Sequence, residues 1–127
     1  MKRFILLISL LLIGLYLNAN KDSCFQAPEN WKSEKDAIKL IENAIFSNSE
    51  SVKPSAKSWM TSAHFYTCNN EFGYLIVKSE KKTFVHQDVP VAIWNALKDA
   101  RTIGGFYNFY IKNQYRLVKK GAKSLVL

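Results

Sequence analysis

The chain is poor in the residues on which most metal and phosphate sites depend. Its 127 residues include two cysteines, two histidines and five glycines. Zinc sites use closely spaced pairs of cysteine or histidine ligands, and Cys24, His64, Cys68 and His86 form no such pair. The sequence also has no glycine-rich phosphate loop, no serine–histidine–acid motif and no pair of carboxylates at a meaningful spacing. We therefore expect no metal, no cofactor and no catalytic residues.

A long apolar run occurs only at the N-terminus. Lys2 and Arg3 precede an apolar segment over residues 4–17, which ends at Asn18-Ala19. This three-part order predicts a secretory signal peptide over residues 1–19, cleaved after Ala19. The alternative is an uncleaved membrane anchor, but the run is shorter than the roughly 20 residues of a spanning helix. We expect export, to the periplasm or outside the cell, with membrane contact only through this segment before cleavage.

The charge balance of the exported part is moderately basic. Loss of Lys2 and Arg3 leaves 16 of the 18 basic residues against 10 acidic ones, so the net charge falls from +8 to +6. A charge of this size is common for a small soluble domain. The length supports one core. We divide the chain into the signal peptide (1–19), an N-terminal arm and helix (20–55), a main domain (56–118) and a basic tail (119–127).

The two cysteines, Cys24 and Cys68, are expected to form a disulfide, because an even cysteine count in an exported chain favours one. The bond would fasten the N-terminal arm to the domain. Two buried free thiols are the alternative. A third possibility is a thiol-dependent enzyme that uses one of these cysteines with His64 or His86, and it is the least favoured.

The periodicity of the exported part predicts an α+β fold. Ser33, followed by an acidic residue at 36, marks the start of a helix over 34–47, and a polar linker follows to Pro54. Alternating apolar residues predict strands over 59–67, 72–77 and 83–87, which make a three-stranded antiparallel meander. Pro90 starts a main helix over 90–101 that packs on the sheet and ends at Gly104-Gly105. The segment 106–116 is predicted to be a short helix or turn that folds back on the sheet.

The second half of the chain, over about residues 56–118, resembles the KTSC domain family. The resemblance is carried by an ordered set of segments: Phe84-Val85-His86, Val89-Pro90, the helix 94–100, Gly105-Phe106-Tyr107-Asn108 and Ile111-Lys112-Asn113-Gln114-Tyr115-Arg116. The family is named for its occurrence at the C-terminus of some lysyl-tRNA synthetases and also includes free-standing bacterial domains. RNA binding has been suggested for it. This chain departs from the family pattern where Phe84-Val85-His86 replaces Tyr-x-Tyr, and in its export signal.

The aromatic segment 106–115, with the basic residues beside it, is the strongest candidate for a binding surface. Aromatic rings stack on bases while lysine and arginine neutralise phosphates. The candidate residues are Tyr107, Tyr110, Lys112, Arg116, Lys119 and Lys120. The alternative is that this segment completes the core, with Phe106, Phe109, Ile111 and Tyr115 buried and Tyr107 and Tyr110 half exposed.

Two classes of binding function remain open from the sequence. The leading hypothesis is an exported, non-enzymatic interaction module for a protein partner, which docks on the sheet edge and the segment 106–116. The second hypothesis is binding of nucleic acid or another anionic polymer through the basic and aromatic residues.

Overall fold

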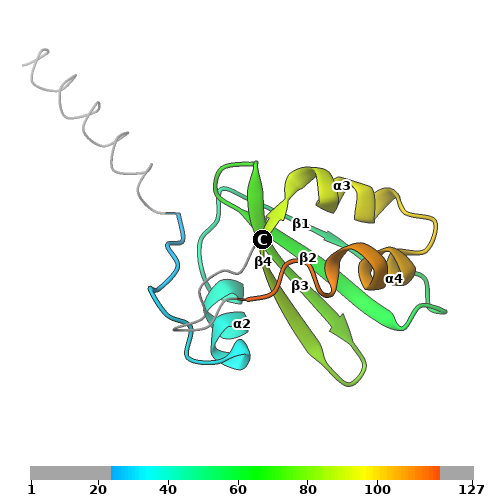
Figure 1. The fold of residues 1–127 in the computed structure, drawn as a ribbon, viewed down its shortest axis with the longest axis horizontal. Helices are drawn as coiled ribbons and strands as arrows, with labels where there is room; N and C mark the ends of the chain where they lie inside the picture. Colours follow the sequence, from blue (N-terminus) through cyan, green and yellow to red (C-terminus); the bar gives the residue numbers. More distant parts are fainter. Residues whose placement is uncertain (1–23, 118–127) are drawn as a thin grey trace, which may run out of the picture.

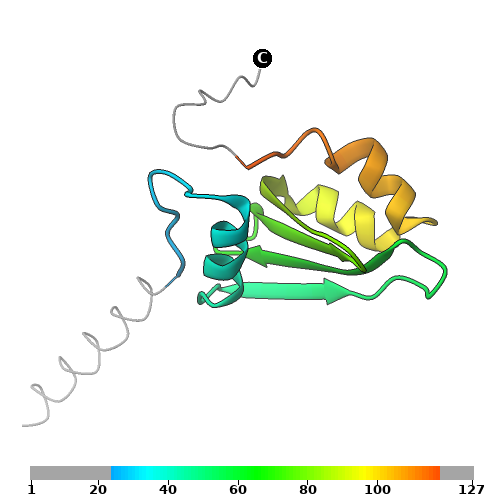
Figure 2. The same cartoon turned by 90° about the horizontal axis from the view of Figure 1, so that it is seen from below.

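The computed structural model describes residues 24–117 and shows a four-stranded antiparallel sheet between two helical layers (Figures 1 and 2). The strands lie in chain order: β1 (Asn48–Val52), β2 (Met60–Thr67), β3 (Phe72–Ser79) and β4 (Thr83–Pro90). One face carries α3 (Val91–Asp99), α4 (Ile103–Phe106) and the π-helical turn η2 (Tyr107–Ile111). The other face carries α2 (Glu34–Glu42). The predicted α+β class is confirmed, and the antiparallel sheet has one strand more than predicted.

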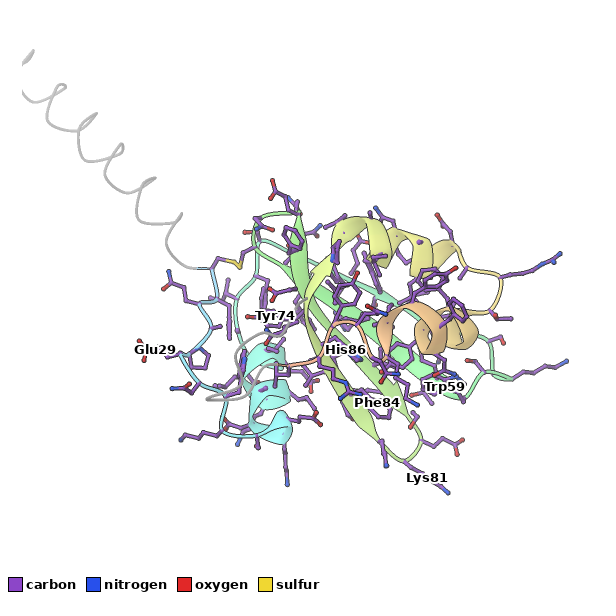
Figure 3. All side chains as sticks on the ribbon, viewed as in Figure 1. Glu29, Trp59, Tyr74, Lys81, Phe84 and His86 are labelled. Atoms are coloured by element: carbon purple, nitrogen blue, oxygen red, sulfur yellow. A yellow bond between two sulfur atoms is a disulfide. The ribbon has the colours of Figure 1, made fainter. Side chains whose placement is uncertain are left out.

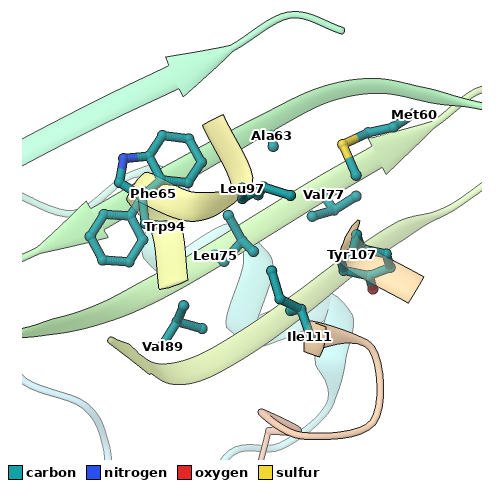
Figure 4. Close-up of a cluster of buried hydrophobic side chains, with 10 residues drawn as sticks. All are labelled: Met60, Ala63, Phe65, Leu75, Val77, Val89, Trp94, Leu97, Tyr107 and Ile111. Atoms are coloured by element: carbon teal, nitrogen blue, oxygen red, sulfur yellow. The ribbon is translucent and has the colours of Figure 1, made fainter. Parts of the chain in front are cut away.

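The larger core lies between the sheet and the α3–α4–η2 layer (Figure 4). Its buried side chains are Met60, Ala63, Phe65, Leu75, Val77, Val89, Trp94, Leu97, Tyr107 and Ile111. Successive side chains of a strand point to opposite faces, so Leu75 and Val77 enter this core while Ile76 enters the other, as the sequence predicts. Trp94 stacks on Phe65 with ring centroids 5.3 Å apart, which fixes α3 on the sheet.

The smaller core joins α2 and the N-terminal arm to the opposite face of the sheet. Ala37, Ile41 and Trp31 are buried there against Ile76 and Val85. Phe25 stacks on Phe46 and on Trp31, at centroid distances of 5.3 and 6.3 Å. These contacts anchor the N-terminal arm to the domain. This layer covers the face of the sheet opposite α3, α4 and η2.

Helix α2 begins where the sequence predicts and ends earlier. The Ser33 hydroxyl accepts a hydrogen bond from the backbone N–H of Asp36 at 3.0 Å, which confirms the N-cap. The helix ends at Glu42 instead of residue 47. The Asn43 side chain donates a hydrogen bond to the carbonyl of Lys39 at 2.8 Å. It thereby satisfies a carbonyl group in the last turn of the helix. Ile45, which lies in the predicted helix but beyond its observed end, is 67% exposed.

The prediction of a polar linker over 47–54 is wrong, because Asn48–Val52 form strand β1. It pairs antiparallel with β2, and Asn48 lies opposite Thr67. Its side chains are almost all exposed, so the strand carries no apolar alternation. A side-chain link to α3 adds to the backbone pairing: the Glu50 carboxylate accepts from Lys98 Nζ at 2.6 Å and Trp94 Nε1 at 3.3 Å. The hydrogen bonds from Lys98 and then Trp94 lower the pKa of Glu50.

The prediction that Gly104-Gly105 end α3 is wrong. The helix ends at Asp99, with Ala100 in extended conformation, and Gly104-Gly105 lie inside α4. The reason for glycine at 104 is close packing, because a Cβ there would overlap the indole of Trp59. In the turn after β2, Asn70 adopts the left-handed conformation with φ 59°, which asparagine tolerates.

Candidate binding surface

The turn η2 and the end of α4 carry apolar side chains on both sides. Tyr107 and Ile111 are four residues apart and point into the larger core (Figure 4). Phe106 and Tyr110 have the same spacing, and their ring centroids are 4.7 Å apart. The turn is wider than an α-helix, since the backbone N–H of Lys112 donates to the carbonyl of Tyr107, five residues back, at 2.9 Å.

The outward side of this segment forms an exposed aromatic cluster. Phe109 is 78% exposed and Tyr110 is 50% exposed, and their ring centroids are 4.9 Å apart. These rings border a wide, open hollow of about 530 Å³, which we call the aromatic hollow. It is lined by Ala100, Arg101, Thr102, Gly105, Phe106, Phe109 and Tyr110. The expectation that Phe109 completes the core is wrong.

A second hollow adjoins the aromatic hollow. This Trp59 hollow has a volume of about 370 Å³ and lies between the segment before β2 and the start of α4. It is lined by Pro54, Ser55, Lys57, Ser58, Trp59, Ala100, Arg101, Thr102, Ile103, Gly104 and Gly105. The turn residues Ala100–Thr102 and Gly105 line both hollows. The two therefore form one continuous surface around the α3–α4 connection.

A buried histidine–tyrosine pair lies on the other side of η2. In the view of Figure 3, His86 lies on β4 between α2 and α4. Tyr107 Oη and His86 Nε2 are 2.6 Å apart, and His86 Nδ1 is 3.0 Å from the carbonyl oxygen of Tyr115. Because a carbonyl can only accept, neutral His86 carries its proton on Nδ1. Its Nε2 therefore accepts a hydrogen bond from the Tyr107 hydroxyl.

Burial holds this pair in its neutral form. Removal from water lowers the pKa of His86 to about 4, although the hydrogen bond to the Tyr115 carbonyl acts in the opposite direction. Burial also raises the pKa of the Tyr107 phenol. The sequence does not show that Tyr107 brings a phenol to His86. The only signal in the sequence is a single histidine on a predicted strand and a tyrosine in a segment that could enter the core.

The predicted binding residues do not form one surface. Tyr107 is 1% exposed and belongs to the core, so the exposed position expected for it is wrong. Tyr110 borders the aromatic hollow, whereas Lys112 and Arg116 border a separate hollow of about 350 Å³ beside His86. Lys119 and Lys120 lie outside the described residues. Sequence reasoning missed Trp59, Lys57 and Arg101, which no motif distinguishes from ordinary surface or strand residues.

The two cysteines are joined in a disulfide, as predicted. Cys24 and Cys68 connect the N-terminal arm to the turn after β2, with Cα atoms 6.1 Å apart. Neither sulfur is a free thiol in this structure. Within residues 24–117, no three His, Cys, Asp or Glu side chains are grouped to hold a metal ion. None of the helices in this part of the chain is long and apolar enough to cross a membrane. The predicted signal peptide, residues 1–19, lies outside it.

Comparison of the chain with models of known families, with curated proteins and with solved structures finds no match in any of the three.

Proposed function

We propose that this chain is an exported, non-enzymatic module that binds a partner protein through the surface around the α3–α4 connection. The observation that carries the proposal is the exposure of Phe109 beside Phe106 and Tyr110. Phenylalanine is among the residues most often buried, and contiguous exposed apolar patches commonly mark interaction sites. The domain has two buried cores of its own. Phe106 packs against the larger one, whereas Phe109 and Tyr110 belong to neither.

Export is part of this proposal and rests on two features. The first 19 residues have the order of a signal peptide. The Cys24–Cys68 disulfide is of the kind that persists in oxidising compartments and is rare in the cytosol. An exported module would meet its partner in the periplasm or outside the cell.

Membership of the KTSC family remains a proposal as well. The structure has the expected order of elements: Phe84-Val85-His86 lies in β4, Val89-Pro90 ends that strand, and α3 follows. The residues 105–111 then form α4 and η2. The suggested RNA binding of the family gives the second candidate function. Its basic residues Lys112 and Arg116 lie at a hollow separate from the exposed rings.

Site-specific photo-crosslinking tests the proposed function. Replacement of Phe109 by a photoreactive phenylalanine analogue should crosslink one defined protein of the exported fraction. Phe72 provides a matched control position, since it is 49% exposed and begins β3 at the sheet end opposite Met60. A crosslink that forms equally at both positions, or none at position 109, would contradict the proposal.

A salt titration separates the second candidate. Binding of nucleic acid or another anionic polymer releases counterions, so its affinity falls steeply as salt increases. A protein partner held mainly by the aromatic rings should lose much less affinity over the same range. Binding of a single-stranded oligonucleotide with a steep salt dependence, abolished by substitution of Lys112 and Arg116, would favour the polymer function instead.

A further inference from the structure

We infer that the partner presents an acidic segment with apolar side chains, which lies along the continuous surface from the Trp59 hollow to the aromatic hollow. This inference rests on the proposed function. It specifies the chemistry of the partner, and it assigns contact roles to Trp59, Lys57 and Arg101.

The continuity of the two hollows gives the segment a path. Arg101 and Gly105 line both hollows, so the two hollows adjoin at these residues and an extended segment could contact both. Trp59 is 39% exposed and forms a wall of the first hollow. Phe109 and Tyr110 form a wall of the second. Apolar side chains of a partner would thus meet aromatic rings at both ends of the path.

The charges along this path are all of one sign. Among residues 24–117, Lys57 and Arg101 are the ionisable cations that line the two hollows, and no aspartate or glutamate of this part of the chain lines either. Neither cation is in a salt bridge among residues 24–117. The neighbouring Lys98, by contrast, is already paired with Glu50 at 2.6 Å. A partner carboxylate would therefore meet a cation that has no competing acid.

The separation of the exposed rings from Lys112 and Arg116 favours a protein segment over single-stranded nucleic acid. Base stacking needs ring faces that are free, but the rings of Phe106 and Tyr110 pack against each other at 4.7 Å. Tyr110 also receives Phe109 in an edge arrangement at 4.9 Å. Phe109, which is 78% exposed, therefore keeps ring faces free, and it is the position of the cations that disfavours nucleic acid. The cations Lys112 and Arg116, which a polymer would also need, border the separate hollow beside His86.

An NMR titration with defined probes tests the inference. The probes are a short peptide of the repeat Glu-Leu-Glu-Ser, a peptide with lysine in place of glutamate, and an oligothymidylate. We expect the acidic peptide to shift the backbone amide signals of residues 57–59 and 100–110, and the basic peptide to leave them unchanged. No shift with the acidic peptide at millimolar concentration, or equal shifts with both peptides, would overturn the inference. Stronger binding of oligothymidylate at the same amides would overturn it in favour of nucleic acid.

Two charge reversals of equal size provide the matched control. Arg101→Glu should weaken binding of the acidic peptide by about three- to tenfold, the range expected for exposed ion pairs that are lost and made repulsive. Arg116→Glu changes the net charge equally but lies at the other hollow, so it should have a smaller effect. Equal weakening by both variants would show a general charge effect and overturn the assignment of Arg101.

The two proposals fail in different ways. If Arg101→Glu leaves the protein crosslinked at position 109 unchanged, the partner is not recognised through its acids, although the aromatic surface still binds it. If no protein crosslinks at position 109, the proposed function itself fails, whatever the acidic peptide does.

Discussion

Acidification should destabilise the folded chain through His86, and the size of the effect follows from its surroundings. In the unfolded chain this imidazole has its ordinary pKa of about 6.5. In the folded chain burial lowers the pKa of His86 to about 4. Between these values the unfolded chain binds a proton that the folded chain does not. The contribution to stability is therefore complete above pH 6.5 and is lost as the pH falls toward 4.

The magnitude is about 3 kcal/mol at pH 4, because one pKa unit corresponds to about 1.36 kcal/mol. The geometry explains why the proton is disfavoured. Protonation would put a hydrogen on Nε2, where the ring now accepts the Tyr107 hydroxyl proton at 2.6 Å. The charged groups at the adjoining hollow are Lys112, Arg116 and Glu34, so two cations and one acid face this position.

The assay is urea unfolding at a series of pH values, for the natural chain and for His86→Gln. Carboxylates titrate in both proteins, so the informative quantity is the difference between their free energies of unfolding. Glutamine cannot bind the proton, and the advantage of the natural chain should shrink by about 3 kcal/mol between neutral pH and pH 4. His64→Gln serves as the comparison. Burial lowers the pKa of His64 as well, so this variant should lose the contribution of His64 but keep that of His86. A difference that stays constant over the range would refute the assignment of a buried neutral His86.

Two further predictions concern stability. Reduction of the Cys24–Cys68 disulfide, which closes a loop with a sequence separation of 44, should lower the free energy of unfolding by up to about 4 kcal/mol. Denaturant unfolding with and without reductant measures this, and identical curves would contradict it. Gly104→Ala should destabilise the chain by about 1–3 kcal/mol because its Cβ meets the Trp59 indole. Gly105→Ala meets only a rotatable threonine hydroxyl and should cost less; an equal cost for both would show that the indole is not the cause.

The elements that the sequence predicts well are those whose side chains report on burial. Strands β2 to β4 alternate or carry continuous apolar residues because their faces enter two cores. The starts of α2 and α3 carry local signals, Ser33 and Pro90, which act within one turn of backbone. Such signals need no knowledge of the remainder of the fold.

Strand β1 could not be predicted for the opposite reason. Its residues 48–52 are nearly all exposed, and its hydrogen bonds are made by backbone groups that every sequence possesses. Its link to α3 joins Glu50 to Lys98, 48 residues later in the chain. The end of α2 was mispredicted because Ile45 continues the helical pattern while lying outside the helix. Apolar periodicity shows which residues are compatible with a buried face, but not whether that face exists.

The candidate binding surface shows the same limit of apolar periodicity as a signal of burial. Positions 106, 107, 109 and 110 are all aromatic, so composition alone cannot tell the buried side of the segment from the exposed side. The register of η2 against the sheet decides it: Tyr107 and Ile111 enter the core, and Phe109 is left in solvent. Tyr107 is fixed further by its hydrogen bond to His86. Folding depends on Tyr107 and the proposed partner binding on Phe109, so substitutions at these neighbouring positions should affect the two separately.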